Sequence, residues 1–523
     1  MSFMLNVIFR GITGISWLLI VIAIGLGGCA TINFDDTKSE SSAFEDTNET
    51  HLGGYAAPRA SAHPPGESGF IFQIDGADAL ATRLLLAQWA ERSIDTQYYL
   101  ISADVIGALF IEALLDAADR GVRVRFLLDD ILTSGYDSGL AALDSHPNVE
   151  LRIFNPVARS GWRAWNSLTD FSRINRRMHN KTFTIDNQFT IIGGRNIAAE
   201  YFGARQDVNF GDADILAIGP VVKDVSRQFD TYWNDQLALP TPALIDVPED
   251  PDAAMKALRG WIENTKENLE NTRYAEVLTK SIFEIIEVDG SDYTWAPYQL
   301  VYDSPKKARD EDLKPDESII PQLVATIDEA EKELIIISPY FIPTKKAIDR
   351  LGDLVDRGVD VIVITNSLAS NNHAVVHSGY APTRKPLIQR GVRIYEVRPD
   401  AGVAGAKETG NTKAESGLHT KAFIVDRNVM FLGSFNWDPR SAYINTELGV
   451  IVESPVMAGT VAAWVDKKLL TATYQVIVNE DGWLRWISRE DGQETVYERE
   501  PETGFWKRFT TGLMGLLPLD SQL

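Results

Sequence analysis

The sequence has little cysteine, little histidine and too few basic residues to balance its acidic ones. Cys29 is the single cysteine among 523 residues, so no disulfide can form within the chain. Lysine and arginine total 50 against 73 aspartates and glutamates, which gives a net charge of −23. A broad nucleic-acid surface needs Lys and Arg to displace counterions, so this balance argues against a nucleic-acid partner without excluding a local basic pocket.

An apolar run over residues 12–28 follows Arg10 and ends at Cys29. This layout is typical of a secretory signal with small residues before a cleavage site. The segment Leu26–Cys29 resembles a bacterial lipobox, which predicts a signal peptide over 1–28 and lipidation of Cys29 after cleavage. The alternative is an uncleaved transmembrane anchor, because the run nearly reaches spanning length. Either interpretation holds the protein at a membrane. As a lipoprotein it would face the periplasm, and Ala30 beside the lipid would suit sorting to an outer membrane.

The length suits two domains or two fused halves. Residues 29–68 are rich in Ser, Thr, Asp, Glu, Gly and Pro and predict a disordered tether, with structure beginning near Gly69. Apolar strands and amphipathic helices then alternate, which indicates α/β layering. The order of elements recurs and predicts a first half at 69–245, a connector at 246–289, a second half at 290–480 and a C-terminal extension at 481–523.

Two stretches of the chain repeat one another. Met178–Asp186 returns 240 positions later as Leu418–Asp426, and both read His-x-Lys, four residues, Asp. A glycine turn ending in Asn follows each copy at the same distance, at Gly193–Asn196 and Gly433–Asn436. Matched spacing over so many positions indicates a duplicated unit.

The repeated residues suit chemistry at phosphorus. Alternate side chains of a strand share a face, so His179 points with Lys181 and His419 points with Lys421. If the halves meet about a pseudo-twofold axis, these four side chains surround a tetrahedral anion. One histidine can then attack phosphorus, while the other protonates the departing oxygen.

Five further positions are expected to bind the phosphate or to support the histidines. The lysines and the amides of Asn196 and Asn436 would stabilise charge on phosphoryl oxygens, and Ser434 lies in the second glycine turn. The strand after each turn begins with an acid, Asp212 in one half and Glu447 in the other. A carboxylate on the far ring nitrogen would fix the tautomer of a catalytic histidine.

The duplicated pattern His-x-Lys-x4-Asp-x6-Gly-[Gly/Ser]-x-Asn resembles that of the phospholipase D superfamily. Within the superfamily, the chain is similar to the bacterial cardiolipin synthases, and most of all to the cardiolipin synthase C group. That closer resemblance rests on Gly193–Ile197 with Glu200–Phe202, Ser338–Pro343, His377–Tyr380, Gly433–Ser441 and Pro501–Arg508. It implies two phospholipase D-type α-β-α sandwich halves in one pseudo-twofold, bilobal domain.

The resemblance also implies an activity. A phosphatidyl group would pass from phosphatidylglycerol to a histidine and then to the alcohol of a second phospholipid, with phosphatidylethanolamine as another candidate substrate and without a metal or cofactor. Members of the superfamily often use the first histidine as nucleophile, which would make His179 the attacker and His419 the acid and base. The residues themselves leave that order open. Asp186 and Asp426 are family residues, which we expect to support the strand and its lysine.

Three other functions fit parts of the same pattern. A phospholipase D would use water as acceptor and release phosphatidic acid, and the sequence does not separate it from a transferase because that choice depends on water exclusion. A secreted nuclease of the superfamily is disfavoured by the acidic composition and the expected anchor. A non-enzymatic lipid-binding protein would not need both motifs intact.

Some residues outside the repeat also bear on function. His373 and His377 have a spacing that could bind a metal on a helix, but no acid separates them and neither recurs in the other half. His377 could instead line the substrate pocket or support the fold. The pair Asp129–Asp130 ends a strand, where α/β sheets bind ligands, although capping of the turn also explains it. In the extension, Trp483–Trp486 and Gly504–Leu517 combine aromatic, basic and aliphatic residues, which suits either a membrane-interfacial segment or a helix packed on the second half.

Overall fold

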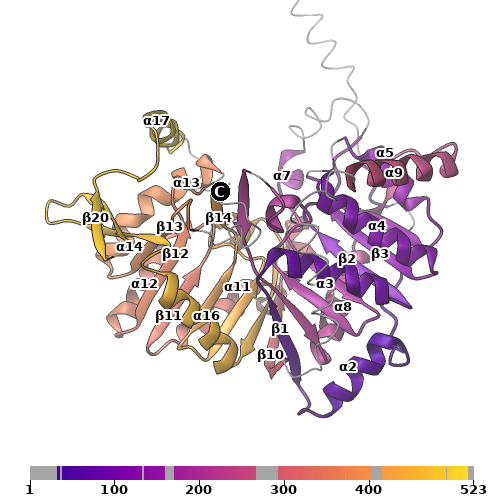
Figure 1. The fold of residues 1–523 in the computed structure, drawn as a ribbon, viewed down its shortest axis with the longest axis horizontal. Helices are drawn as coiled ribbons and strands as arrows, with labels where there is room; N and C mark the ends of the chain where they lie inside the picture. The colour runs from indigo at the N-terminus through magenta and orange to yellow at the C-terminus, as the bar shows by residue number, and fades with distance from the viewer. Residues whose placement is uncertain are drawn as a thin grey trace, which may run out of the picture.

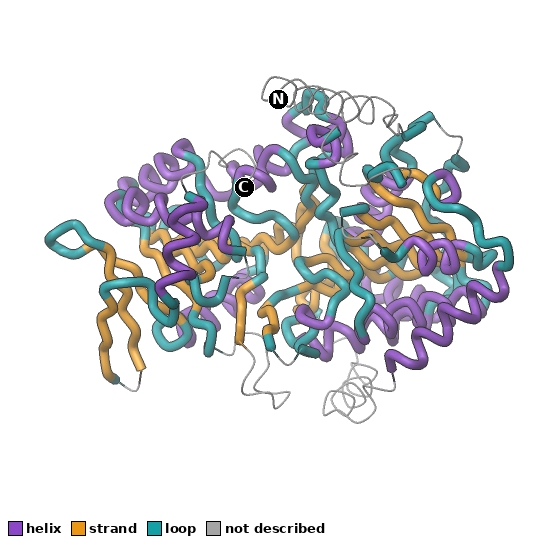
Figure 2. The backbone as a smooth tube through the Cα atoms, turned by 90° about the horizontal axis from the view of Figure 1, so that it is seen from above, coloured by secondary structure: helices purple, strands orange, loops and turns teal. Residues whose placement is uncertain are grey.

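Two α/β halves of matching topology lie side by side in the computed structural model (Figure 1). The structure describes residues 32–35, 38–131, 133, 135–159, 170–205, 207–266, 293–371, 373–401, 415–490 and 492–515. In the view from above, helices lie outside the strands in both halves (Figure 2). The predicted α/β class and two-lobed arrangement are confirmed.

The first half is built on a mixed sheet in which β2, β3 and β4 are parallel. Its strands pair in the spatial order β1 (Glu67–Gln73), β8 (Asp214–Ile218), β6 (Phe189–Gly193), β5 (Thr182–Ile185), β2 (Ser93–Tyr98), β3 (Arg123–Asp129), β4 (Val149–Phe154) and β9 (Ala238–Pro240).

The second half repeats this order. Its strands are β10 (Thr294–Tyr302), β17 (Leu448–Glu453), β16 (Val429–Gly433), β15 (Ala422–Val425), β11 (Glu333–Ile337), β12 (Asp360–Asn366), β13 (Arg393–Val397) and β18 (Thr473–Val478). β19 (Leu484–Glu490) and β20 (Gln493–Tyr497) then extend the sheet, so its edge lies beyond the predicted boundary at residue 480. β1 pairs with β10 antiparallel, which joins both halves into one 18-stranded sheet within the described residues.

Helices cover both faces of each half. In the first half they are α2 (His51–Ser61), α3 (Gly76–Trp89), α4 (Val105–Asp119), α5 (Asp137–Asp144), α7 (Phe171–Ile174), α8 (Pro220–Trp233) and, after it, α9 (Pro251–Lys266). In the second half they are α11 (Ile319–Asp328), α12 (Lys345–Asp356), α13 (Ala374–Tyr380), α14 (Arg384–Gln389), α15 (Pro439–Tyr443), α16 (Pro455–Lys468) and α17 (Phe505–Met514). Glycines with positive φ follow α4 and α12, at Gly121 (φ 93°) and Gly358 (φ 94°), and allow the chain to turn into the next strand.

The hydrophobic core crosses the boundary between the halves. One cluster contains α3, α4 and the first sheet, and another contains α11, α12 and the second sheet. A third cluster takes Phe70 and Ile215 from the first half and Ile424 and Leu448 from the second. Separating the halves would expose this apolar surface to water, so the two behave as one folded unit.

The prediction of a disordered tether is wrong for residues 38–68. Leu52 and Ala56 of α2 are buried in the core of the first half. The Ser41 carbonyl accepts a hydrogen bond from Arg125 Nη1 at 2.9 Å, and the Phe44 ring lies 3.8 Å from the Arg123 guanidinium carbon. A few apolar anchors and many polar contacts order this segment, although its composition predicts the opposite.

Other boundaries also differ from the expectation. The first part of the predicted connector contains α9, which packs on α4 and α5 of the first half. The predicted signal peptide and Cys29 lie outside the described residues. Within the described ranges, no helix has the length and apolar character required to cross a membrane.

Candidate active site

The first motif histidine is fixed against the second half by backbone pairing. Met178 forms a parallel bridge with Thr446, and the His179 N–H donates to the Thr446 carbonyl at 2.9 Å. The residue after Thr446 is Glu447, and its Oε2 lies 2.8 Å from His179 Nδ1. The acid that faces the first histidine therefore comes from the second half.

The second histidine repeats this arrangement with the halves exchanged. β14 (Glu415–Leu418) pairs in parallel with β7 (Val208–Gly211), so that Leu418 lies opposite Gly211. The His419 N–H donates to the Gly211 carbonyl at 2.7 Å. His419 Nδ1 then lies 2.5 Å from Oδ2 of Asp212. The two halves thus exchange their acids across the pseudo-twofold axis.

Each motif lysine is directed back to its own histidine, as predicted, although the His-x-Lys segments lie just before β5 and β15 and not in a strand. Lys181 Nζ donates to the His179 carbonyl at 2.6 Å. Lys421 Nζ donates to the His419 carbonyl at 2.5 Å and lies 3.0 Å from its Nε2. His179 is 8% exposed and His419 is 6% exposed, so water has little access to either ring.

The two motifs form one electrostatic site. Burial, Lys181 and Lys421 together hold the pKa of His179 well below its usual value. Burial and Lys421 lower the pKa of His419 to about 3, although Asp212 opposes the shift. Burial also lowers the pKa of Lys181 to about 7 and that of Lys421 to about 8. Both imidazoles are therefore neutral at pH 7, as a nitrogen nucleophile requires.

The two acids differ in their surroundings. Glu447 accepts hydrogen bonds from Ser434 Oγ at 2.5 Å and from Ser441 Oγ at 2.8 Å. Burial raises the pKa of Glu447 to about 7, against the effect of Lys181. Glu447 is therefore partly protonated at neutral pH.

Asp212 stays ionised. Burial acts to raise its pKa, but His419 and Lys421 hold that pKa well below the usual value. Gly194 stands where the second half has Ser434, and a Cβ there would lie 2.5 Å from Asp212 Oδ1. The first half thus pairs a short acid with glycine, and the second pairs a longer acid with serine.

The two amides of the repeat have hydrogen-bonding capacity left. Asn196 and Asn436 are buried, and neither amide oxygen has a hydrogen-bond partner among the described residues. Buried polar atoms are nearly always paired, so an unpaired amide oxygen beside a reactive site suggests a ligand that donates a hydrogen bond to it, such as a hydroxyl group.

The two motif aspartates serve the fold. The carboxylate of Asp186 accepts backbone hydrogen bonds from Arg92 at 2.8 Å and from Ser93 at 2.9 Å, at the start of β2. Asp426 does the same for Lys332 and Glu333 at the start of β11. Within the described chain, no hydrogen bond joins either aspartate to a motif lysine, so each supports a neighbouring strand instead.

Sequence comparison decides the family. A family model described as "Cardiolipin synthase, PLD-like domain" matches residues 85–233 and 323–469, once in each half. The chain belongs to this family. The predicted membership of the phospholipase D superfamily is confirmed, and the chain is an enzyme of that superfamily.

Members of the family resemble the chain over most of its length. The chain is 41% identical to cardiolipin synthase C of Escherichia coli over 485 residues, which cover 90% of this chain and 99% of that one. It is 25% identical to cardiolipin synthase A of Pseudomonas aeruginosa over 380 residues, 72% of this chain and 62% of that one. The crystal structure of phosphatidylserine synthase from Haemophilus influenzae has the same fold, with a TM-score of 0.54, 13% identity, and coverage of 80% of this chain and 91% of that one.

Several residues around the site of this cardiolipin synthase homologue were missed from sequence. The Tyr99 ring lies 5.0 Å from the His179 ring, and the Tyr201 ring lies 4.9 Å from the His419 ring, both edge-on. Asp303 accepts a hydrogen bond from the Glu447 N–H at 3.0 Å. Tyr201 and Ser441 stand inside motifs that carry the family resemblance, which was the available signal. No sequence pattern indicated that Tyr99 or Asp303 lies at the site.

The other residues singled out from the sequence have structural contacts. Asp129 accepts hydrogen bonds from the N–H groups of Ile131 and Met178, both at 2.9 Å, so it caps the turn and steadies the first motif. His377 is buried, with Nε2 3.3 Å from Arg384 Nη2, whereas His373 is exposed. In the part of the chain that the structure describes, no group of three or more His, Cys, Asp or Glu residues could hold a metal ion.

Proposed function

We propose that the chain transfers a phosphatidyl group from phosphatidylglycerol, through a phosphohistidine, to the alcohol of a second phospholipid. The observation that carries this proposal is the crossed pairing of each motif histidine with an acid of the other half. It creates one buried site with two neutral imidazoles and two lysines, which suits an in-line displacement at phosphorus. The similarity to cardiolipin synthase C supports the same conclusion.

In the first step, His179 is the nucleophile. Its Nδ1–H donates to Glu447, so the lone pair of Nε2 is free to attack phosphorus. The bond from phosphorus to the oxygen of the head-group glycerol breaks. His419, which is neutral in the free enzyme, takes up a proton when the anionic phosphate binds beside it and gives that proton to the departing oxygen. His419 suits the acid role because ionised Asp212 stabilises an imidazolium, and the bound phosphate adds further negative charge.

In the second step, the incoming alcohol loses its proton to His419 and its oxygen attacks phosphorus, which breaks the bond to His179. With two molecules of phosphatidylglycerol, the products are cardiolipin and glycerol. The lysines, Asn196 and Asn436 stabilise the phosphoryl oxygens, and Ser434 orients Glu447. No metal or cofactor takes part in either step.

The low exposure of both histidines favours transfer over hydrolysis. Water must reach phosphorus at the His179 adduct before it can compete, and a closed site limits its entry. The head group of a phospholipid acceptor can occupy the space beside the His179 adduct and so keep water out of it. This burial supports a transferase, with phospholipase D activity as the second candidate.

A hydrophobic face on α17 supports action at a membrane. Phe505, Phe509 and Leu513 recur every four residues and are 63%, 52% and 57% exposed, beside Trp506 at 72%. α17 packs on α13, and Lys507 Nζ donates to the Ala369 carbonyl at 3.1 Å. Figure 1 shows α17 as an outlying helix next to α13. We assign this face, which we call the α17 face, to contact with the bilayer.

The N-terminal segment supplies the second attachment in this proposal. Cleavage before Cys29 and lipidation of that cysteine would hold the enzyme at the periplasmic side of a membrane. A Cys29→Ala substitution should release the mature protein from membranes or stop its processing. An unchanged, uncleaved membrane protein would instead indicate a spanning anchor.

Product analysis tests the proposed function. Purified enzyme receives labelled phosphatidylglycerol in vesicles, with and without phosphatidylethanolamine, and the lipid product is identified by mass. Cardiolipin establishes transfer, whereas phosphatidic acid alone establishes hydrolysis. Degradation of DNA by the same protein would favour a nuclease, and the absence of any product would favour a lipid-binding protein.

A further inference from the structure

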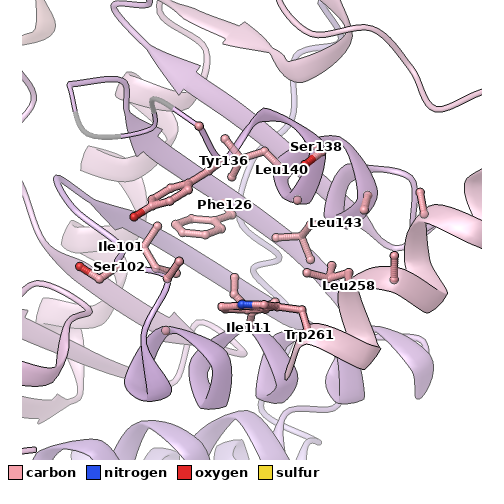
Figure 3. A pocket seen from close by; sticks show the side chains of 17 residues that line it. Ile101, Ser102, Ile111, Phe126, Tyr136, Ser138, Leu140, Leu143, Leu258 and Trp261 are labelled. Atoms are coloured by element: carbon pink, nitrogen blue, oxygen red, sulfur yellow. The ribbon is translucent and has the colours of Figure 1, made fainter. Parts of the chain in front are cut away.

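An apolar cavity of about 520 Å³ lies in the first half, among α4, α5 and α9. In Figure 3, Trp261 stands across the cavity from Leu140, with Leu143 and Leu258 next to each other at one side and Phe126 between top and bottom. The lining is almost entirely hydrocarbon. Such a lining gains free energy when an apolar ligand displaces water from it, so the cavity suits an apolar ligand.

One end of this cavity adjoins the active site. Ile101 lines it two residues after Tyr99, whose ring contacts His179, and Ile101 also forms a parallel bridge with Ile197 beside Asn196. Figure 3 shows the hydroxyl groups of Tyr136 and Ser102 at this end.

The wall of the cavity that contains Tyr136 is also connected to the active site, through Asp129. The loop that contains Tyr136 starts at Asp129, which accepts the hydrogen bond from the Met178 N–H. Two walls of the cavity are therefore continuous with segments that hold the first motif. The end that carries Ile101 and Ser102 is therefore the end nearest to the first motif along the chain.

We propose that this cavity holds part of an acyl chain of the phospholipid substrate. The inference rests on the proposed function, because it assigns the occupant from the substrate class. The motif histidines are buried, so a lipid phosphate must leave the bilayer surface to reach them. The attached chain then needs apolar cover, and each buried methylene strengthens binding by about fourfold.

Gly139 offers a direct way to fill the cavity. It lines the cavity on α5, and a Cβ at this position meets no atom within 4 Å. Gly139→Trp should therefore fill the space proposed for the acyl chain without moving the protein backbone. Gly139→Leu should fill part of that space. Gly107 also lines the cavity but is unsuitable, because a Cβ there would lie 1.9 Å from the Ser102 carbonyl oxygen.

Gly260 provides the matched control. It lies on α9, is exposed, is not part of the cavity lining, and likewise has no atom within 4 Å of its Cβ position. The readout is kcat/KM for dioleoyl-phosphatidylglycerol and for dihexanoyl-phosphatidylglycerol, each with the wild type and the three variants.

We expect Gly139→Trp to lower kcat/KM for the dioleoyl lipid by about tenfold or more while the dihexanoyl value stays within about twofold, since only the long chain loses contacts. Gly139→Leu should give a smaller loss, and Gly260→Trp should change neither value. Equal losses on both lipids, or no loss on either, would overturn the proposal. Activity on the short lipid also shows that each variant is folded.

A binding measurement separates this inference from the proposed reaction. His179→Ala protein, which should not turn over lipid, is titrated with the fluorescent fatty acid cis-parinaric acid. Binding that Gly139→Trp weakens by about tenfold supports the cavity as an acyl site even if no transferase activity is found. If the probe does not bind, or binds equally well to the filled variant, another occupant fills the cavity and the proposal fails.

Discussion

His179 Nδ1 lies 2.8 Å from Glu447 Oε2, across 268 residues of chain and across the boundary between the two halves. His419 and Asp212 repeat the relationship over 207 residues in the opposite sense. Neither half therefore contains a complete histidine–carboxylate pair. The site depends on how the halves pack as much as on the motifs themselves.

The two acids should differ in their importance. Asp212→Asn removes an ionised carboxylate from His419 and should lower kcat on phosphatidylglycerol by about 10²- to 10⁴-fold. Glu447→Gln should cause a smaller loss, because Glu447 is already partly protonated at pH 7. Glu453→Gln, at the exposed end of β17, the strand that follows Glu447, is the control and should retain activity. Equal losses for the two acids would contradict the assigned asymmetry.

The order of the histidines can be tested by trapping the intermediate. His179→Ala and His419→Ala should each lower turnover by about 10³-fold or more. A lipid substrate with a good leaving group does not need an acid, so His419→Ala protein should accumulate labelled phosphohistidine on His179. Mass spectrometry of a digest locates the label. A label on His419 in His179→Ala protein would reverse the order, and full activity in either variant would remove the shared site altogether.

Stability should depend on pH through Glu447. Its pKa rises on folding from about 4.5 to about 7, so the folded state binds the proton more tightly. The contribution to stability is complete below pH 4.5 and is lost as the pH rises to about 7, by at most about 3 kcal/mol. The two motif histidines, whose pKa values are lowered on folding, act in the opposite sense over this range, so the wild type must be compared with Glu447→Gln. In urea unfolding, the stability of the wild type relative to Glu447→Gln should fall by this amount between pH 4.5 and 7. A parallel pH profile in the variant would contradict the prediction.

The glycine turns should not be interchangeable. Gly194→Ala places a Cβ 2.5 Å from Asp212 Oδ1, so the acid must move away from His419 and kcat should fall by about tenfold or more. Ser434→Ala has room but leaves Glu447 without one donor, which should lower the free energy of unfolding by about 1–3 kcal/mol. Gly459→Ala, on α16 in open space, serves as the control. Normal activity of Gly194→Ala would show that the contact with Asp212 is not essential.

The α17 face should contribute to vesicle binding and not to chemistry. Replacing Trp506 and Phe509 by serine should weaken sedimentation with phosphatidylglycerol vesicles by about tenfold, because two exposed rings no longer enter the interface. Activity on dihexanoyl-phosphatidylglycerol should stay within about twofold. Thr510→Ser, on the same exposed helix, is the matched control. Unchanged sedimentation of the double variant would exclude the α17 face as a membrane contact.

The duplication made much of the site predictable. A constant offset between His179 and His419 shows in the sequence, and it also led to Asp212 and Glu447. The sequence could not show which acid faces which histidine. That depends on two backbone pairings, Met178 with Thr446 and β14 with β7, and strand pairing between distant segments is a property of the packed molecule.

The errors have equally local causes. The segment at 38–68 has few apolar residues, but Leu52 and Ala56 lie one turn apart on α2 and are both buried in the core. The average composition of the segment therefore predicted disorder wrongly. Asp186 was expected to support its own strand and lysine. It instead accepts hydrogen bonds from the N–H groups that begin β2, a strand distant in sequence that pairs with its own strand β5 only in the folded molecule.

The pairing of β1 with β10 and the exchanged acids also bear on ancestry. An unfused half would have carried a histidine without its carboxylate, so a single-motif ancestor could act only as a homodimer, with two identical dyads. Joining two copies in one polypeptide freed each dyad to evolve separately. The present differences, Asp with Gly on one side and Glu with Ser on the other, are a divergence that two identical subunits could not show.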